Sequence, residues 1–212
     1  MAVISKEALN EIIFSEVSSE AYYNKYLSGI TVPPNDSGAT IGIGYDLGYA
    51  TKNTLKQDWL FEIGTKQCDI LNMFIGIKGD KARNAVQNNP LAKQVKIPFK
   101  SAYNVFIKSS LPSYYRKALS IYPGLDKLEP NAIGAVVSLV YNRGTSLDGD
   151  RRKEMKELVS AIANKDYKKM AALFRSMKRL WDNGLVSRRE REAVLIDNCQ
   201  KTYDGDDLIQ IT

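Results

Sequence analysis

Three side chains in the first quarter of the chain carry groups that acid and base catalysis needs: the carboxyls of Glu16 and Asp46 and the hydroxyl of Thr40. The chain contains no histidine, so proton transfer near neutral pH falls to carboxyls, lysines, tyrosines or thiols. Glycoside hydrolysis needs one carboxyl that protonates the leaving oxygen, and inverting enzymes need a second group that orients or activates water. Glu16, together with Thr40 and Asp46, fits that requirement and predicts a glycan-cleaving site.

Thr40 and Asp46 lie in a glycine-rich run, Ser37 to Gly48. Gly42 and Gly44 have no Cβ atom, so a backbone or a ligand can approach them closely. A nucleotide-binding loop is the competing interpretation of such a run. Its spacing is wrong, because the glycines form G-x-G-x-x-x-G instead of G-x-G-x-x-G and no Gly-Lys-Ser/Thr follows. The run therefore does not predict phosphate binding.

Each candidate also has a simpler explanation. Glu16 could cap a helix or form a local ion pair, and Asp46 could accept hydrogen bonds from the amides of its own turn. Taken one at a time, these residues favour the simpler explanation. The catalytic interpretation depends on their combination.

A short helix and a hairpin are the elements expected around these residues. Residues 5–15 have the apolar spacing of an amphipathic helix with Ser5 as its N-cap, which places Glu16 at the C-terminal end. Two β-like stretches within residues 29–43 flank a proline- and glycine-containing turn and predict a hairpin or small sheet. After Gly48 we expect helices to the end of the chain. They are predicted over residues 51–63, 65–74, 81–88, 101–111, 113–121, 131–141, 154–163, 167–181 and 187–198.

The composition is that of an ordered globular protein. The 212 residues fit one domain, and 44% of them are hydrophobic and 25% charged. A formal net charge of +6 suits an anionic partner, but it does not distinguish nucleic acid, anionic lipid and cell-wall polymer. Cys68 and Cys199 show no metal-ligand spacing, and histidine is absent, so we expect free thiols and neither a metal nor a cofactor.

The N-terminal residues carry charges where a secretory signal peptide needs its apolar segment, and nowhere do about 18 apolar residues run together. We therefore expect a product that is made in the cytoplasm and is not stably inserted in a membrane. If its substrate lies outside the cytoplasm, another system must deliver it.

Four segments of the chain each match a sequence motif of one known protein family. They are the helix-end Glu16 followed seven residues later by Tyr23, the run Thr40-Ile41-Gly42-Ile43-Gly44, the run Ser138-Leu139-Val140-Tyr141-Asn142-Arg143-Gly144, and the run from Gly184 to Ala193 preceded by Trp181. With these segments the chain resembles the phage-type lysozymes, glycoside hydrolase family 24, and most of all their pesticin-like branch. The resemblance covers the chain from about residue 8 to residue 198.

The resemblance implies a lysozyme-like α+β fold in a single domain over residues 1–212. A catalytic, β-containing lobe would span about residues 16–50 and a helical lobe about residues 51–212, with a cleft between them. Glu16 would be the general acid, and Thr40 would help to hold the attacking water. The second carboxylate would be Asp46, six residues after Thr40. Asp36 is the alternative, although its Pro-Pro-Asn-Asp-Ser-Gly surroundings are already typical of a turn.

Three further residues take binding or orienting roles from the resemblance. Arg188 would contact and orient the Glu16 carboxyl, although the arginines around it could equally form a solvated helix face. Tyr45 stands where the family usually has histidine and would lie at the cleft. Asn142 could line the sugar cleft, but helix capping also explains it.

The implied activity is that of a bacteriolytic peptidoglycan muramidase. Such an enzyme hydrolyses the β-1,4 bond between N-acetylmuramic acid and N-acetylglucosamine, here by an inverting displacement without metal or cofactor. Two alternatives stay open: a lytic transglycosylase, which needs only one catalytic acid, and a non-catalytic basic protein that binds wall polymer or nucleic acid. We expect peptidoglycan, and not nucleic acid, as the partner. Delivery through holin-made membrane holes, in a virion or by a secretion apparatus would bring it to the wall, and a secreted effector would also have an immunity protein.

Overall fold

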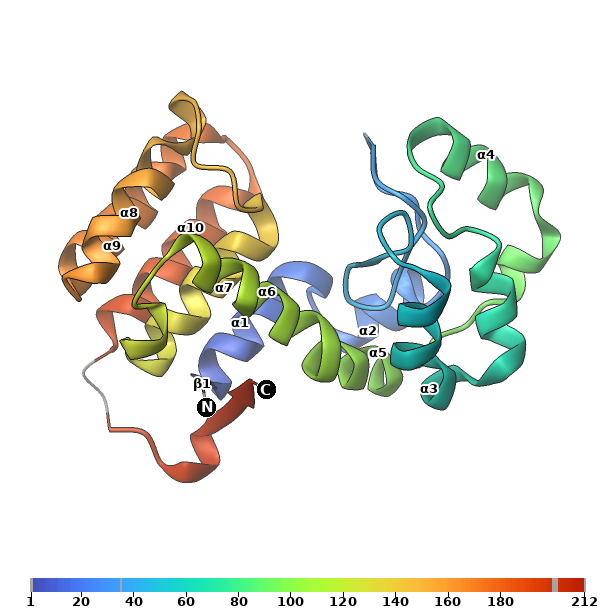
Figure 1. Ribbon diagram of the computed structural model, residues 1–212, viewed down its shortest axis with the longest axis horizontal. Coiled ribbons are helices and arrows are strands. Elements are labelled where there is room, and N and C mark those ends of the chain that lie inside the picture. The colour runs from blue at the N-terminus through green and yellow to red at the C-terminus, as the bar shows by residue number, and fades with distance from the viewer. Residues whose placement is uncertain (1, 35, 200–201, 212) are drawn as a thin grey trace. The chain divides into compact units, whose positions relative to one another are not determined.

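The computed structural model describes residues 2–34, 36–199 and 202–211 (Figure 1). Most of these residues lie in helices, and their strands form two antiparallel sheets of two strands each. The expected α+β class is confirmed at this coarse level. The chain divides into two compact units: the first combines residues 1–15 with residues 111–212, and the second runs from Glu16 to Ser110.

The second unit contains a short hairpin, which lies later in the chain than the one predicted within residues 29–43. Strands β2 (Thr40–Ile41) and β3 (Tyr45–Asp46) pair antiparallel. Thr31 pairs with Thr40 as an isolated bridge, so the expected pairing of the two β-like stretches is reduced to one position. Two consecutive prolines follow Thr31 closely, and proline has no N–H group to continue a ladder of hydrogen bonds.

Helices make up the rest of the second unit. Helix α3 begins at a capping box, in which Thr51 Oγ1 accepts from Thr54 N at 3.1 Å and Thr54 Oγ1 accepts from Thr51 N at 2.9 Å. It is kinked at Gly64, where φ is 75°, as the predicted break between residues 63 and 65 requires. The elements are α2 (Glu20–Tyr22), a π-helical turn (Tyr23–Leu27), α3 (Lys52–Asn72), α4 (Gly79–Asn88), a 3₁₀ turn (Pro90–Gln94), α5 (Phe99–Val105) and a second π-helical turn (Phe106–Ser110).

Helices α3 and α5 pack against each other and enclose the hairpin turn. Trp59 of α3 is fully buried, and a Cβ atom added to Gly42 would lie 2.7 Å from the Trp59 ring and 3.4 Å from Ala102 of α5. The compact unit that contains the hairpin extends to Ser110, because the hairpin turn packs on the apolar side chains of these helices.

The first unit is built around α7 (Pro130–Arg143), whose residues Pro130 to Val140 are all buried. Helix α1 (Lys6–Val17), whose residues up to Ser15 belong to this unit, lies close to α7, since a Cβ atom on Gly134 would meet the Ala8 Cβ at 2.3 Å. Helices α8 and α9 lie side by side, and α10 packs on α9 and α7 (Figure 1). The remaining elements are α6 (Leu111–Ile121), α8 (Lys153–Ala163), α9 (Tyr167–Ser176), α10 (Gly184–Asp197) and 3₁₀ turns at Leu125–Lys127, Asp150–Arg152, Met177–Leu180 and Gly205–Asp207.

Several local predictions for the helices are confirmed. Ser5 caps α1, because its hydroxyl accepts a hydrogen bond from Ala8 N at 3.0 Å. The apolar helix around residues 131–141 is central and buried. Cys68 and Cys199 are buried free thiols.

Among the helices that the structure describes, none combines the length and apolar character needed to cross a membrane.

Two predictions about the helical part are wrong. The chain is not helical to its end, because β4 (Leu208–Ile211) pairs antiparallel with β1 (Ala2–Ser5), with Ala2 opposite Ile211. Such short strands give little periodicity, and their partners lie at opposite ends of the sequence. Pro112 does not separate two helices either. Residues 99–121 are helical throughout, and a π-helical turn ends just before α6, which leaves Pro112 at the second position of that helix.

Candidate functional site

Glu16 is the next-to-last residue of α1 and is partly exposed. The helix ends just after it, because Ser18 has a left-handed backbone conformation with φ of 59°. Ser19 then caps α2, and its hydroxyl accepts a hydrogen bond from Tyr22 N at 3.1 Å. A carboxylate near a helix C-terminus faces the negative end of the helix dipole and does not stabilise the helix. The placement of Glu16 therefore favours a role other than helix formation.

Thr40 and Asp46 stand directly opposite each other in the hairpin, and Ile41 stands opposite Tyr45. Directly opposed residues of an antiparallel pair place their side chains on the same face of the sheet. The structure therefore brings the candidate hydroxyl and the candidate second carboxylate together. Both belong to the unit that also contains Glu16.

Gly38 holds both side chains. Its amide donates to the Asp46 carboxylate at 3.0 Å (Oδ1) and 3.2 Å (Oδ2), and its carbonyl accepts from the Thr40 hydroxyl at 3.2 Å. Gly48 N donates a further hydrogen bond to Asp46 Oδ1 at 2.7 Å. Asp46 therefore does accept hydrogen bonds from backbone amides of its own turn, as the simpler explanation predicts. In the described part of the chain, Oδ2 receives only the longer of the two Gly38 contacts, so it keeps capacity to accept from water.

The glycines of this run are required by close contacts around Asp46. A Cβ atom on Gly38 would lie 2.4 Å from Gly48 N and 2.5 Å from Asp46 Oδ1. A Cβ atom on Gly48 would lie 2.9 Å from the Lys78 side chain and 3.0 Å from Asp46 Oδ1. Both glycines let two backbone amides reach one carboxylate, which explains their spacing better than a phosphate-binding loop does.

Gly42→Ala is expected to destabilise the second unit by about 2–4 kcal/mol, because the new methyl group combines backbone strain with overpacking. The φ of Gly42 is +58°, and its Cβ would lie 2.7 Å from the Trp59 ring. Urea unfolding followed by tryptophan fluorescence measures the change.

Gly76→Ala is the matched control. Gly76 has a φ of +75°, and no atom lies within 4 Å of its Cβ position. Its substitution should cost about 1 kcal/mol, from backbone strain alone. Equal losses in the two variants would show that the contact with Trp59 does not fix the hairpin.

Tyr45 is half-buried and tied to α3. Its hydroxyl donates to Asp58 Oδ2 at 2.8 Å, and its ring packs edge-on against Trp59 with centroids 5.5 Å apart. Burial, and then the hydrogen bond and charge of Asp58, raise the pKa of Tyr45 far above its ordinary value. Tyr45 therefore positions β3 on α3, and its predicted place at a sugar cleft stays a prediction. Asp36, the alternative second carboxylate, is exposed in the turn before Gly38.

Arg188 lies in the first unit, within a buried polar cluster on α10. Its guanidinium donates to Glu192 Oε1 at 3.2 Å and to the carbonyl and hydroxyl oxygens of Ser138 at 3.1 and 3.0 Å. Arg189 adds an ion pair with Glu192, with Nε 2.8 Å from Oε2, and a hydrogen bond from Nη2 to Oε1 at 2.8 Å. Arg188 is 4% exposed and Arg189 0%, so the solvated-face interpretation is wrong for both. The expected contact of Arg188 with Glu16 stays a prediction.

Glu192→Gln is expected to reduce the free energy of unfolding by about 3–5 kcal/mol, because it leaves two buried guanidinium groups beside a neutral partner. Burial raises the pKa of Glu192, and the charges of Arg189 and Arg188 act against that rise. Glu190→Gln, two residues earlier in α10, is the control: its side chain is 40% exposed and pairs with Arg175 and Lys178. It should cost no more than about 1 kcal/mol in the same urea titration. Similar losses in both variants would contradict a structural role for the buried cluster.

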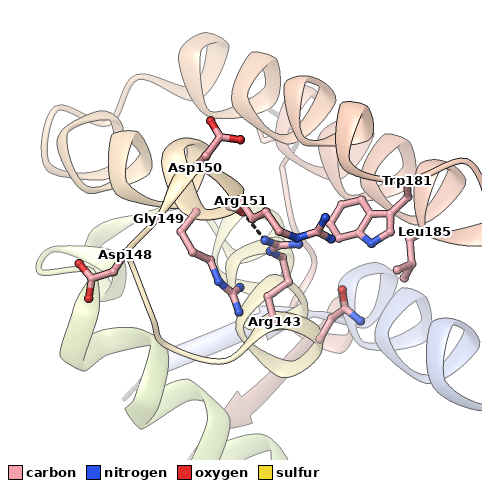
Figure 2. A pocket seen from close by; sticks show the side chains of 9 residues that line it. Arg143, Asp148, Gly149, Asp150, Arg151, Trp181 and Leu185 are labelled. Carbon is pink, nitrogen blue, oxygen red and sulfur yellow. Dashed lines mark hydrogen bonds between the residues drawn. The ribbon is translucent and has the colours of Figure 1, made fainter. Parts of the chain in front are cut away.

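Asn142 is exposed at the end of α7 and lines a pocket of the first unit with a volume of 630 Å³ (Figure 2). The next residue, Arg143, lies over the Trp181 ring, with Cζ 4.7 Å from the ring centroid. The pocket is lined by Asn142, Arg143, Asp148, Gly149, Asp150, Arg151, Arg152, Trp181 and Leu185.

A protein-family model matches about half of the chain. The chain belongs to the family described as a domain of unknown function (DUF8812), whose model matches residues 12–121. That range contains the whole second unit, with Glu16, Thr40 and Asp46. No curated protein matches the chain.

Sequence reasoning missed the pocket beside Trp181, which lies outside the matched range of this DUF8812 family member. The adjacent arginines Arg151 and Arg152 were the available signal. Such a pair usually marks a solvated surface, and only the fold shows that it faces Arg143 and Trp181.

Proposed function

We propose that the chain is a peptidoglycan muramidase with a lysozyme-like fold, and that it hydrolyses the β-1,4 bond between N-acetylmuramic acid and N-acetylglucosamine. The observation that carries this proposal is the pairing of Thr40 with Asp46 across the hairpin, with Gly38 bonded to both side chains. A hydroxyl and a carboxylate held side by side, in the same unit as the helix-end Glu16, provide the groups that an inverting glycosidase needs.

The hydrogen bonds of the hairpin suit the positioning of a water molecule. The Thr40 hydroxyl donates its proton to Gly38 O, so its lone pairs are left to accept. Asp46 Oδ2 keeps acceptor capacity next to it. A water that donates to both groups would turn its own lone pair outward, toward the sugar, and would lose a proton to Asp46 as it attacks.

Glu16 would act on the other side of the bond. Its protonated carboxyl would give a proton to the glycosidic oxygen as the bond from that oxygen to the anomeric carbon breaks. The water oxygen would form the new bond to the anomeric carbon from the opposite face. Proton return from Asp46 to Glu16 through solvent would complete the cycle, and the configuration of the product would be inverted.

A lytic transglycosylase is the second candidate. The hydrogen bonds from Gly38 and Gly48 give Asp46 a structural role, and in a transglycosylase the second carboxylate would need no other. Mass spectrometry of muropeptides released from purified peptidoglycan separates the two reactions. A muramidase releases reducing N-acetylmuramic acid ends, and a transglycosylase releases 1,6-anhydro ends. A non-catalytic wall-binding or nucleic-acid-binding protein would release neither.

Peptidoglycan is the proposed partner. Because this polymer lies outside the cytoplasm, the muramidase would reach it through holin-made holes, in a virion or by a secretion apparatus. In the last case an immunity protein would protect the producing cell.

A further inference from the structure

Three arginines and one tryptophan surround the pocket of the first unit. Arg143 projects from the end of α7, and Arg151 and Arg152 come from the 3₁₀ turn Asp150–Arg152. Figure 2 shows Arg143 next to Trp181, and a dashed line joins it to the Arg151 backbone carbonyl, which accepts from Arg143 Nη2. Further hydrogen bonds to the Met155 sulfur, from Arg143 Nε at 3.4 Å and Arg152 Nη1 at 3.3 Å, hold two of these side chains in place.

The negative groups of the pocket lie away from these arginines. The carboxylates of Asp148 and Asp150 point outward, away from Arg143 (Figure 2). The Asp150 carboxylate accepts a hydrogen bond from Arg179 Nη1 at 3.2 Å, so its charge is already balanced. Burial, followed by the positive charge of Arg152 and other arginines, lowers the pKa of Arg143 to about 10, which still leaves it charged at neutral pH. The pocket therefore combines mutually repelling positive charges that an anion would stabilise.

We propose that this pocket binds an oxyanion, either a carboxylate or a phosphate, whose carbon-bearing part rests on Trp181. Guanidinium groups match the planar geometry of such anions and bind them with two parallel hydrogen bonds. The indole ring of Trp181 also lines the pocket and adds apolar surface beside the arginines. A volume of 630 Å³ is within the range of small-molecule sites. This proposal uses only residues of the first unit and does not depend on muramidase activity.

Fluorine NMR of the full chain labelled with 5-fluorotryptophan tests this site. The chain has two tryptophans, and Trp59 is buried in the other unit, so its resonance reports on folding. Trp181→Phe assigns the resonances. The probes are inorganic phosphate and N-acetylglycine, titrated at constant ionic strength against chloride. We expect a saturable shift of the Trp181 resonance, with the Trp59 resonance unchanged.

Variants of the arginines locate the binding. Arg151→Ala and Arg152→Ala should each lower the affinity for the saturating probe by about 10-fold, which corresponds to the loss of one charge-assisted hydrogen bond. Lys153→Ala is the matched control, because Lys153 carries the same charge in the next position but does not line this pocket. Saturation by phosphate alone assigns a phosphoryl ligand, and saturation by N-acetylglycine alone assigns a carboxylate. If neither probe saturates, or if Lys153→Ala weakens binding as much as the arginine variants, the proposal is wrong.

Discussion

Glu16→Gln should lower the rate of muropeptide release from purified peptidoglycan by about 10²–10⁴-fold, the usual contribution of a general acid. Glutamine keeps the size of the side chain but has no carboxyl proton to give to the leaving oxygen. The assay is the appearance of soluble muropeptides, separated and quantified by liquid chromatography with mass detection.

The fold of this variant should be unchanged. Glu16 is partly exposed and lies at the C-terminal end of α1, where its charge does not stabilise the helix. A urea titration of Glu16→Gln, run beside the activity assay, separates a loss of stability from a loss of chemistry. Glu20→Gln is the matched control, since Glu20 is an exposed carboxyl four residues away, in α2. Full activity in Glu16→Gln, or an equal loss in Glu20→Gln, would remove Glu16 from the mechanism.

Asp46→Asn should reduce the same rate by about 10²-fold or more, because an amide cannot take a proton from the attacking water. The fold should survive, since the oxygen of the asparagine side chain can still accept from the amides of Gly38 and Gly48. Asp46→Ala removes that acceptor and should destabilise the hairpin by about 1–3 kcal/mol, which separates structure from chemistry.

Two further variants locate the carboxylate and the hydroxyl. Asp36→Asn should have parent-like activity, because Asp36 is exposed and takes no part in the Gly38 hydrogen bonds that order Thr40 and Asp46. Thr40→Ser should retain more activity than Thr40→Ala, since serine keeps the hydroxyl. An active Asp46→Asn with an inactive Asp36→Asn would transfer the role to Asp36. Activity in both would favour the transglycosylase reaction.

The sequence predicted those parts of the fold that local signals determine. Ser5 and Thr51 are helix caps because their side chains bond to amides three residues later, and Gly64 breaks α3 because it adopts a positive φ. The strand pair β1–β4 could not be predicted, because each strand has four residues and they lie at opposite ends of the sequence. The boundary of the second unit at Ser110 also depends on packing, which brings the helix carrying Trp59 to the hairpin.

The candidate site was predictable to a similar degree. The resemblance predicted that Thr40 and Asp46 act together, and the structure pairs them across the hairpin, while their catalytic roles stay predictions. The hydrogen bonds of Gly38 to both Asp46 and Thr40 were not predictable. They depend on a close approach of Gly38 to Gly48 that only the folded turn creates. For Arg188, the sequence left open an environment that the structure excludes. Its arginine-rich neighbourhood allowed a solvated helix face, whereas Glu192 and Ser138 hold it in a buried cluster.

The anomeric form of the first product tests most directly whether Thr40 and Asp46 deliver water to the glycosidic bond. Proton NMR in the first minutes of peptidoglycan cleavage, before mutarotation, resolves the new N-acetylmuramic acid end. We expect the α-anomer, because water that attacks opposite a leaving group protonated by Glu16 inverts a β bond. An initial β-anomer, a 1,6-anhydro end or no new end would contradict this mechanism.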